Sequence, residues 1–245
     1  MRVILACVAL AAALGLARVA AAADAPPPPA PRVLAYLTAD DIDPARLLPP
    51  PPIDGSAQAL AEVAELRRIA AAATPDRWAR AKWDNDNEDG TIFQSAIAAG
   101  YDLKALPATA RLLDEVRNEE SIASSRAKVL FKRNRPWIVD PSLKTCSRDE
   151  KPQTSYPSGH TTMAFAMAVV LAQAMPDIAP QIMSRAGDYA ESRLVCGMHY
   201  RADIVGGQTL GTAVAVQMLH NPAFQADLAA ATAELQAAHL TAPRP

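Results

Sequence analysis

Hydrophobic residues recur at intervals of three and four along most of the chain after residue 55. The stretch SAQALAEVAELRRIAAAAT starts with Ser56, a residue type that often caps helices, and spaces its apolar residues at i, i+3 and i+4. The same spacing predicts further helices near 75–84, 91–99, 107–117, 119–134, 160–175, 178–194, 202–219 and 222–239. Alternating patterns typical of strands are almost absent. We therefore expect an all-α fold, a single compact helical domain without internal repeats.

The first 46 residues depart from this helical pattern. Residues 1–23 combine Arg2, an apolar stretch and small residues up to Ala23, an order that predicts a cleaved signal peptide. Residues 24–46 begin with DAPPPPAPR and form a proline-rich leader, and residues 47–245 form the helical domain. The apolar stretch of the signal is too short to span a membrane comfortably. We expect an exported, periplasmic protein without stable membrane insertion.

Charge argues against a nucleic-acid partner, and the cysteine content indicates a possible disulfide. The formal net charge is −2, and no basic patch indicates a nucleic-acid partner. Removal of the signal peptide would leave Cys146 and Cys196 as the cysteines of the mature chain. In an oxidising compartment such a pair favours a disulfide, which would close a loop of about 50 residues. The alternative is two buried free thiols.

The stretch NDNEDG at 85–90 resembles the start of a calcium-binding loop, with acids at alternate positions and a glycine sixth. Such a loop needs a bidentate glutamate at position twelve, where this chain has Ala96. A solvated loop between helices is the better interpretation. We expect no metal ligands here.

Three clusters of polar residues carry candidate chemistry, and the first contains Lys128 and Arg135, followed by Pro136. Seven helical steps of 100° would leave the two cations about 20° apart around one helix axis. Two such cations repel each other unless an anion lies between them. Taken alone, the cluster is better explained as a solvated basic helix face.

The second cluster is SYPSGHTT at 155–162, where Ser158, Gly159 and His160 precede an apolar helix. Free backbone N–H groups at a helix start bind anions, and a glycine lets a ligand approach the backbone closely. The Ser158 hydroxyl adds a donor. A serine N-cap beside an incidental histidine explains the stretch equally well.

The third cluster is SRLVCGMHYRAD at 192–203. His199 and Asp203 are four residues apart, so on a helix they share a face, and the carboxylate can hold one imidazole nitrogen. Arg193 is six residues before His199, and Gly197 would let the chain turn so that the two converge. Taken alone, a surface His–Asp pair is the simpler explanation.

Together the clusters supply two histidines, an aspartate, three cations, a serine and a glycine-led helix start. A carboxylate ligand could not use so many donors, but a tetrahedral phosphate could. One histidine can attack phosphorus while the other protonates the leaving oxygen. The combination predicts phosphoryl transfer.

In order and separation, the clusters resemble the three-part signature of the type-2 phosphatidic acid phosphatase and vanadium haloperoxidase superfamily. LLPPPP, SYPSGHT, SRLVCGMH and HNPAF resemble the bacterial class A non-specific acid phosphatases more closely, from about residue 47 to beyond 225. Two departures lie beside the chemistry. Thr154 stands where this group usually has glycine, and Tyr200-Arg201-Ala202 replaces the more usual Trp-Gln-Ser.

The resemblance implies a secreted acid phosphatase that hydrolyses small phosphate monoesters with broad specificity and requires neither a metal nor another cofactor. It implies that His199 attacks phosphorus and becomes phosphorylated, that Asp203 orients it, and that His160 is the general acid and then the base. The residues expected to bind the phosphate oxygens are Lys128, Arg135, Ser158, Gly159 and Arg193.

Other functions use similar residues. The nearest alternative is a lipid phosphate or diphosphate phosphatase of the same superfamily. A vanadate-dependent haloperoxidase would use the same pocket, and a non-catalytic phosphate-binding protein would need the cations but not two histidines and an aspartate. Each of these, like the expected phosphatase, is compatible with a homo-oligomer.

Overall fold

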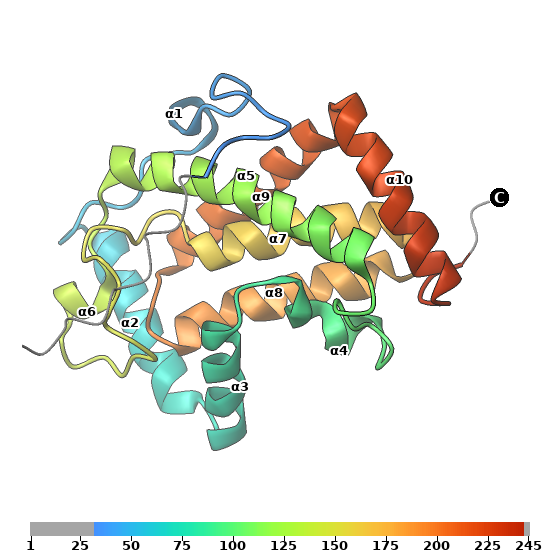
Figure 1. The fold of residues 1–245 in the computed structure, drawn as a ribbon. Helices are drawn as coiled ribbons and strands as arrows, with labels where there is room; N and C mark the ends of the chain where they lie inside the picture. Colours follow the sequence, from blue (N-terminus) through green and yellow to red (C-terminus); the bar gives the residue numbers. More distant parts are fainter. Residues whose placement is uncertain (1–31, 243–245) are drawn as a thin grey trace, which may run out of the picture. The chain divides into compact units, whose positions relative to one another are not determined.

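The computed structural model describes residues 32–242. The predicted signal peptide and the first residues of the predicted leader lie outside these described residues. The described chain forms one compact unit of helices and contains no strand, which confirms the predicted all-α fold (Figure 1).

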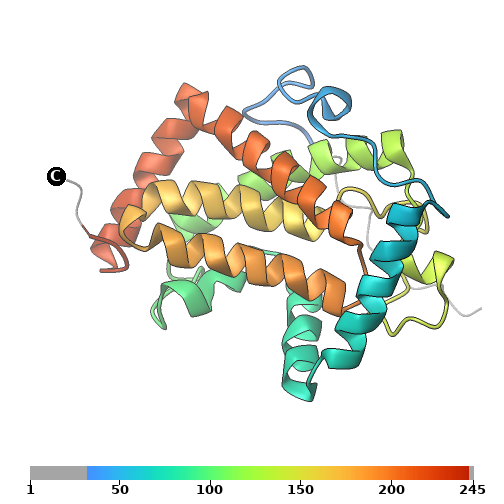
Figure 2. The ribbon, with the colours of Figure 1, turned by 180° about the vertical axis from the view of Figure 1, so that it is seen from behind.

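Helix α7 (Gly159–Ala174) is the central element of the fold. Its sequence is apolar on all sides, and a helix of that kind is stable only when other elements surround it. Helices α5 (Pro107–Phe131), α8 (Ala179–Val195) and α9 (Arg201–His220) pack around it. Figure 2 shows α7 and α8 side by side. Because α7 starts at the SYPSGHTT cluster, its burial fixes that cluster at the centre of the molecule.

Glycines in α9 allow it to approach α7 very closely. A Cβ atom at Gly207 would lie 2.7 Å from the carbonyl oxygen of Ser158, and one at Gly211 would lie 2.2 Å from that of Thr162. Only glycine permits this contact between backbones. As a result, the N–H of Ser158 donates to the carbonyl oxygen of Asp203 at 3.0 Å, and the second and third clusters meet.

The remaining helices surround this central group. Helices α2 (Ala57–Ala72) and α3 (Pro75–Asp86) start at Ser56 and Thr74, whose side chains accept backbone N–H bonds as N-caps. Helix α3 packs on α8, and α10 (Pro222–Ala237) packs on α5. The short elements are α1 (Pro44–Leu47), η1 (Gly90–Phe93), α4 (Gln94–Ile97), α6 (Pro136–Val139) and η2 (Pro176–Ile178).

The region expected to form two helices, 107–117 and 119–134, is the single helix α5. The polar residues in its middle interrupt the apolar pattern, but they have distant partners. The Asn118 side chain donates to the carbonyl oxygen of Val33, and the Glu119 carboxylate accepts the N–H groups of Ala35 and Tyr36. The helix therefore continues through a polar stretch that would break a purely local pattern.

Part of the predicted leader packs within the compact unit. Leu37 and Ile42 are buried, and the Tyr36 ring contacts the Phe224 ring edge-on with centroids 5.2 Å apart. In the following LLPPPPID stretch Leu48 is buried, whereas Ile53 is 80% exposed. The helical unit of the described chain therefore extends to residues before 47.

The apolar helix α7 has only 16 residues. Within residues 32–242, no helix combines the length and the hydrophobicity needed to cross a membrane.

Candidate active site

Lys128 and Arg135 come from different elements, contrary to the expectation that they share one helix. Helix α5 ends at Phe131, and Lys132 caps it in a left-handed conformation with φ of 47°. Arg135 precedes Pro136 in extended conformation, which is the conformation that a following proline favours. The two cations therefore approach the site from two directions, with a turn between them.

The start of α7 forms as the sequence predicts. Ser158 is the N-cap, and its hydroxyl oxygen accepts the N–H of Thr161 at 3.3 Å. A Cβ atom at Gly159 would lie 3.4 Å from Nζ of Lys128 and 3.6 Å from Oγ of Ser124. The first cluster therefore meets the second at Gly159.

The turn after α8 brings Arg193 and His199 to the same site. Gly197 has φ of +59°, and a Cβ atom there would lie 2.6 Å from the carbonyl oxygen of Lys144. A larger residue would be both strained and obstructed. The N–H of Met198 donates to the carbonyl oxygen of Arg193 at 3.0 Å and closes the turn. This turn agrees with the role expected of Gly197.

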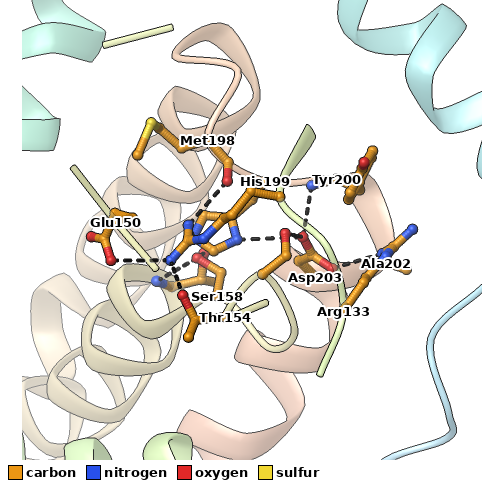
Figure 3. A network of polar contacts seen from close by, with 12 residues as sticks. Arg133, Glu150, Thr154, Ser158, Met198, His199, Tyr200, Ala202 and Asp203 are labelled. Atoms are coloured by element: carbon orange, nitrogen blue, oxygen red, sulfur yellow. Dashed lines mark hydrogen bonds and ion pairs between the residues drawn. The ribbon is translucent and has the colours of Figure 1, made fainter. Parts of the chain in front are cut away.

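His199 and Asp203 are in contact, but they do not share a helix face as expected. His199 precedes α9, and Asp203 lies in its first turn. The carboxylate accepts the N–H of Tyr200 at 2.9 Å and lies 3.3 Å from Nδ1 of His199 (Figure 3). The aspartate therefore caps the helix and contacts the imidazole at once.

Two further groups hold the Asp203 carboxylate. Arg133 donates to Oδ1 at 2.7 Å, and the hydroxyl of Ser155 donates to Oδ2 at 2.6 Å. Arg133 also pairs with Glu62 on α2, and its guanidinium lies over the Tyr200 ring. Burial raises the pKa of Asp203, while the nearby Arg133 opposes that rise. Sequence reasoning missed Arg133, although it lies in the basic stretch that contains Lys128 and Arg135.

Arg135 contacts the other nitrogen of His199. Its Nη1 lies 2.8 Å from Nε2 of His199 and donates to the carbonyl oxygen of Met198 at 3.1 Å. Its Nη2 reaches Glu150 at 3.3 Å and the hydroxyl of Thr154 at 3.2 Å. Because a guanidinium only donates, Nε2 must accept, and the ring proton is on Nδ1 facing Asp203. Thr154, a departure from the resembled family, thus helps to hold Arg135.

Both ring nitrogens of His160 have partners. Nε2 lies 3.2 Å from the carbonyl oxygen of Asn85, and Nδ1 lies 3.2 Å from Oε1 of Glu88. The ring stacks on Tyr189 at 6.0 Å between centroids. Arg193 donates to the Asn85 side chain at 2.9 Å. Since a carbonyl oxygen only accepts, Nε2 carries a proton, and Nδ1, beside the Glu88 carboxylate, is the nitrogen that can gain or lose one.

The NDNEDG stretch is therefore not the solvated loop that we expected. Its first residues belong to α3, and the buried Asp84 just before it pairs with Arg185 and accepts the Ser192 hydroxyl. The stretch forms the wall of the site beside His160. Asn85 and Glu88 were missed because their contacts reach elements about 75 to 110 residues away in sequence.

These groups meet at a cavity of about 300 Å³, which we call the site cavity. Ser158 and Arg193 are almost completely buried beside it. Among the described residues, no three His, Cys, Asp or Glu side chains are grouped so that they could hold a metal ion. The predicted residues that line the cavity directly are Lys128, Arg135, Gly159, His160 and His199.

Lys128 and Arg135 line the cavity as cations, together with the carboxylates of Glu88, Glu120 and Glu150. Burial and the nearby Arg135 lower the pKa of Lys128 to about 8, and burial lowers the pKa of Arg135 to about 10. Burial and the surrounding cations hold the pKa of His199 and His160 well below the usual value for histidine. An anion placed between these cations would relieve their mutual repulsion.

Cys146 and Cys196 form a disulfide in the structure. The N–H of Cys146 also donates to the carbonyl oxygen of Cys196 at 3.1 Å. The bridge joins the segment after Arg135 to the turn that carries His199.

Comparison with known proteins decides the family. A model of the PAP2 superfamily matches residues 120–225, a range that contains all eight predicted catalytic and phosphate-binding residues. An acid phosphatase from Zymomonas mobilis is 33% identical over 211 residues, which cover 83% of this chain and 79% of that protein. This chain belongs to the PAP2 superfamily. A non-specific acid phosphatase from Salmonella typhi is 31% identical over 77% of this chain and 78% of that protein.

Two solved structures share the fold. Aquifex aeolicus LpxE superposes with a TM-score of 0.54 at 20% identity, covering 69% of this chain and 99% of that one. A transmembrane PAP2 type phosphatidylglycerolphosphate phosphatase from Bacillus subtilis superposes with a TM-score of 0.51 at 17% identity, covering 67% and 85%. The predicted resemblance is thus confirmed, and the PAP2 relatives named acid phosphatases agree with the expected enzyme class, a phosphoric monoester hydrolase.

Proposed function

We propose that this PAP2 protein is a secreted acid phosphatase that hydrolyses small phosphate monoesters of broad structure through a phosphohistidine on His199. One observation carries the proposal. Nδ1 of His199 faces Asp203, while Nε2 accepts from Arg135 beside the site cavity that both residues line. The nitrogen that lies beside the anion-binding groups is therefore the one that carries no proton and can act as a nucleophile.

In the first step, Nε2 of His199 attacks phosphorus, an N–P bond forms and the bond to the ester oxygen breaks. The proton on Nδ1 remains near Asp203, which stabilises the positive charge that develops on the ring. His160 gives a proton from Nδ1 to the departing oxygen, so the product leaves as an alcohol. The groups that stabilise the charge on the phosphoryl oxygens are Lys128, Arg135, Ser158, Gly159 and Arg193.

In the second step, His160 acts as a base. It takes a proton from water, the water oxygen attacks phosphorus, and the N–P bond breaks. His199 is then neutral again, and phosphate leaves the cavity. The same histidine thus returns in the second step to the protonation state that it needs for the first.

Electrostatics support activity in acid. The low pKa of His199 keeps this nucleophile unprotonated where a surface histidine would carry a proton. His160 must carry a proton to act as an acid, and a bound phosphate adds negative charge that favours this form. As pH rises, His160 loses its proton and activity on esters with poor leaving groups should fall.

A lipid phosphate phosphatase is less well supported, although both structural relatives described above share this fold. None of the described residues that line the site cavity has an apolar side chain, so an acyl chain would find no apolar contact there.

The proposal that the protein is exported rests on residues 1–23, whose pattern is that of a signal peptide.

Phosphate release by the purified protein tests the proposal. We expect hydrolysis of p-nitrophenyl phosphate in acid with EDTA present, because the cations of the site are side chains. Bromide oxidation that required vanadate and peroxide, without phosphate release, would contradict the proposal. Activity that was lost in EDTA and restored by magnesium would contradict the metal-independent mechanism. Phosphate binding without turnover would indicate a binding protein.

A further inference from the structure

We infer that Glu120 and Ser124 form a subsite that binds a hydroxyl group on the alcohol part of the substrate, so that esters of polyols and sugars are preferred. The inference rests on the proposed phosphatase function. It specifies which class of alcohol the site cavity binds as the leaving group.

The two residues lie on the face of α5 that carries Lys128. Glu120, Ser124 and Lys128 are spaced four apart, so their side chains follow one another along the helix. All three line the site cavity. A Cβ atom at Gly159 would lie 3.6 Å from Oγ of Ser124, so this hydroxyl lies next to the proposed phosphate position. Glu120 lies one turn farther from Lys128.

Both side chains have a buried polar atom without a partner. Oγ of Ser124 and Oε2 of Glu120 have no hydrogen bond, and each residue is only 3% exposed. Buried polar atoms are nearly always paired, and an unpaired one is costly. The adjacent Glu119 also has one unpaired oxygen, but its other oxygen binds the N–H groups of Ala35 and Tyr36. Glu119 does not line the cavity, so no ligand can reach it there.

A hydroxyl-bearing alcohol satisfies both atoms. Its O–H can donate to the Glu120 carboxyl, and its oxygen can accept from the Ser124 hydroxyl. Burial and the nearby Glu88 raise the pKa of Glu120, which therefore also has a proton to donate at acid pH. Because the described lining of the cavity has no apolar side chain, an alkyl or aryl group gains little by entering it.

The ratio of kcat/KM for glycerol 1-phosphate to that for propyl phosphate tests the inference. Both esters have a three-carbon leaving group, and comparing the ratio between variants cancels their intrinsic difference in reactivity. We expect Ser124→Ala and Glu120→Leu each to lower the ratio about tenfold, the effect of one hydrogen bond to a buried partner. Hydrolysis of propyl phosphate should change less than about threefold, since that ester makes no such bond.

Two controls separate selectivity from folding. Glu120→Gln keeps the size and hydrogen-bonding capacity of the side chain and should keep the wild-type ratio. Ser184→Ala removes an exposed hydroxyl on α8 and should also keep it. Equal losses on both esters in Ser124→Ala and Glu120→Leu would overturn the inference, since they would place these residues in phosphate binding or folding.

Hydrolysis of p-nitrophenyl phosphate by the wild type distinguishes a failure of the subsite inference from a failure of the proposed phosphatase function. If the wild type hydrolyses this ester but the glycerol-to-propyl ratio is the same in all variants, the inference alone is wrong. If the wild type releases no phosphate from any of the three esters, the proposed function is wrong, and the inference with it.

Discussion

Oε1 of Glu88 lies 3.2 Å from Nδ1 of His160, while the Asn85 carbonyl oxygen lies 3.2 Å from the other ring nitrogen, Nε2. Glu88 also lines the site cavity and contacts Arg117 at 3.2 Å. As in the Asp203–His199 pair, a carboxylate faces a ring nitrogen, but here it faces the nitrogen that exchanges the proton. Glu88 is therefore placed to favour the protonated form of His160 against the cations Lys128, Arg135 and Arg193.

Glu88→Gln should weaken the general acid. Without the carboxylate the pKa of His160 falls further, so the protonated form is lost at lower pH as pH rises. We expect kcat/KM for an alkyl phosphate near neutral pH to fall about tenfold, part of the ~100- to 10,000-fold that general acid catalysis supplies. The alkaline limb of the pH profile should move to lower pH, while p-nitrophenyl phosphate, whose leaving group needs no proton, should change little.

Asp76→Asn is the control for Glu88→Gln. Asp76 is an exposed acidic residue in the first turn of α3, and it does not line the site cavity. An equal loss on both esters in Glu88→Gln, or an unmoved alkaline limb, would show that Glu88 acts only on structure.

Glu150→Gln should tighten phosphate binding. The Glu150 carboxylate lies 3.3 Å from Nη2 of Arg135, where it competes with and repels a phosphate oxygen. Met198 and Thr154 also hold Arg135, so the guanidinium should stay in place. Because the Glu150 side chain is 43% exposed, we expect a modest effect, with KM lowered about threefold and kcat little changed.

Inhibition by inorganic phosphate measures the expected tighter binding in Glu150→Gln without a contribution from the chemical steps. The carboxylate of the neighbouring Asp149 accepts the Ser147 hydroxyl rather than binding Arg135, so Asp149→Asn is the control. A higher KM in Glu150→Gln would mean that the carboxylate orients Arg135 more than it repels the substrate.

Loss of the disulfide should destabilise the fold. The bridge joins Cys146 and Cys196 across a sequence separation of 50. In the chain-entropy model a loop of that size corresponds to about 4 kcal/mol, so the double variant Cys146→Ser/Cys196→Ser should lose about that much free energy of unfolding. Denaturant titration of both proteins measures it. Equal midpoints, or two reactive thiols in the unfolded and unreduced wild type, would rule out a stabilising bridge.

Local sequence was sufficient for the helices and the three clusters. Apolar spacing of three and four reflects burial of one helix face, so α2, α8 and α10 lie close to their predicted positions. Ser158 caps α7, one of the two interpretations that the stretch allowed, because capping depends on residues three apart. The same local rules gave the correct fold class.

Contacts between distant residues could not be predicted in this way. Arg133 joins Glu62 and Asp203, which are 71 and 70 residues away. The continuity of α5 depends on the segment at 33–36, more than 80 residues earlier. Helical geometry was also misleading where the chain turns, since Arg135 and His199 both lie outside the helices that the spacing arguments assumed for them. Pro136 was the available signal for Arg135, because a proline disfavours helix at the residue before it.

The identity of the phosphorylated residue tests the account most directly. Wild type, His160→Asn and His199→Asn are mixed rapidly with p-nitrophenyl phosphate, and the phosphoenzyme is trapped and mapped. We expect His160→Asn to release a burst of nitrophenol and then stall with an acid-labile phosphate on His199, because water is no longer activated. His199→Asn should show neither burst nor label, since it has no attacking nitrogen. A phosphoenzyme that still formed in His199→Asn but was absent from His160→Asn would show that the two histidines have the opposite roles.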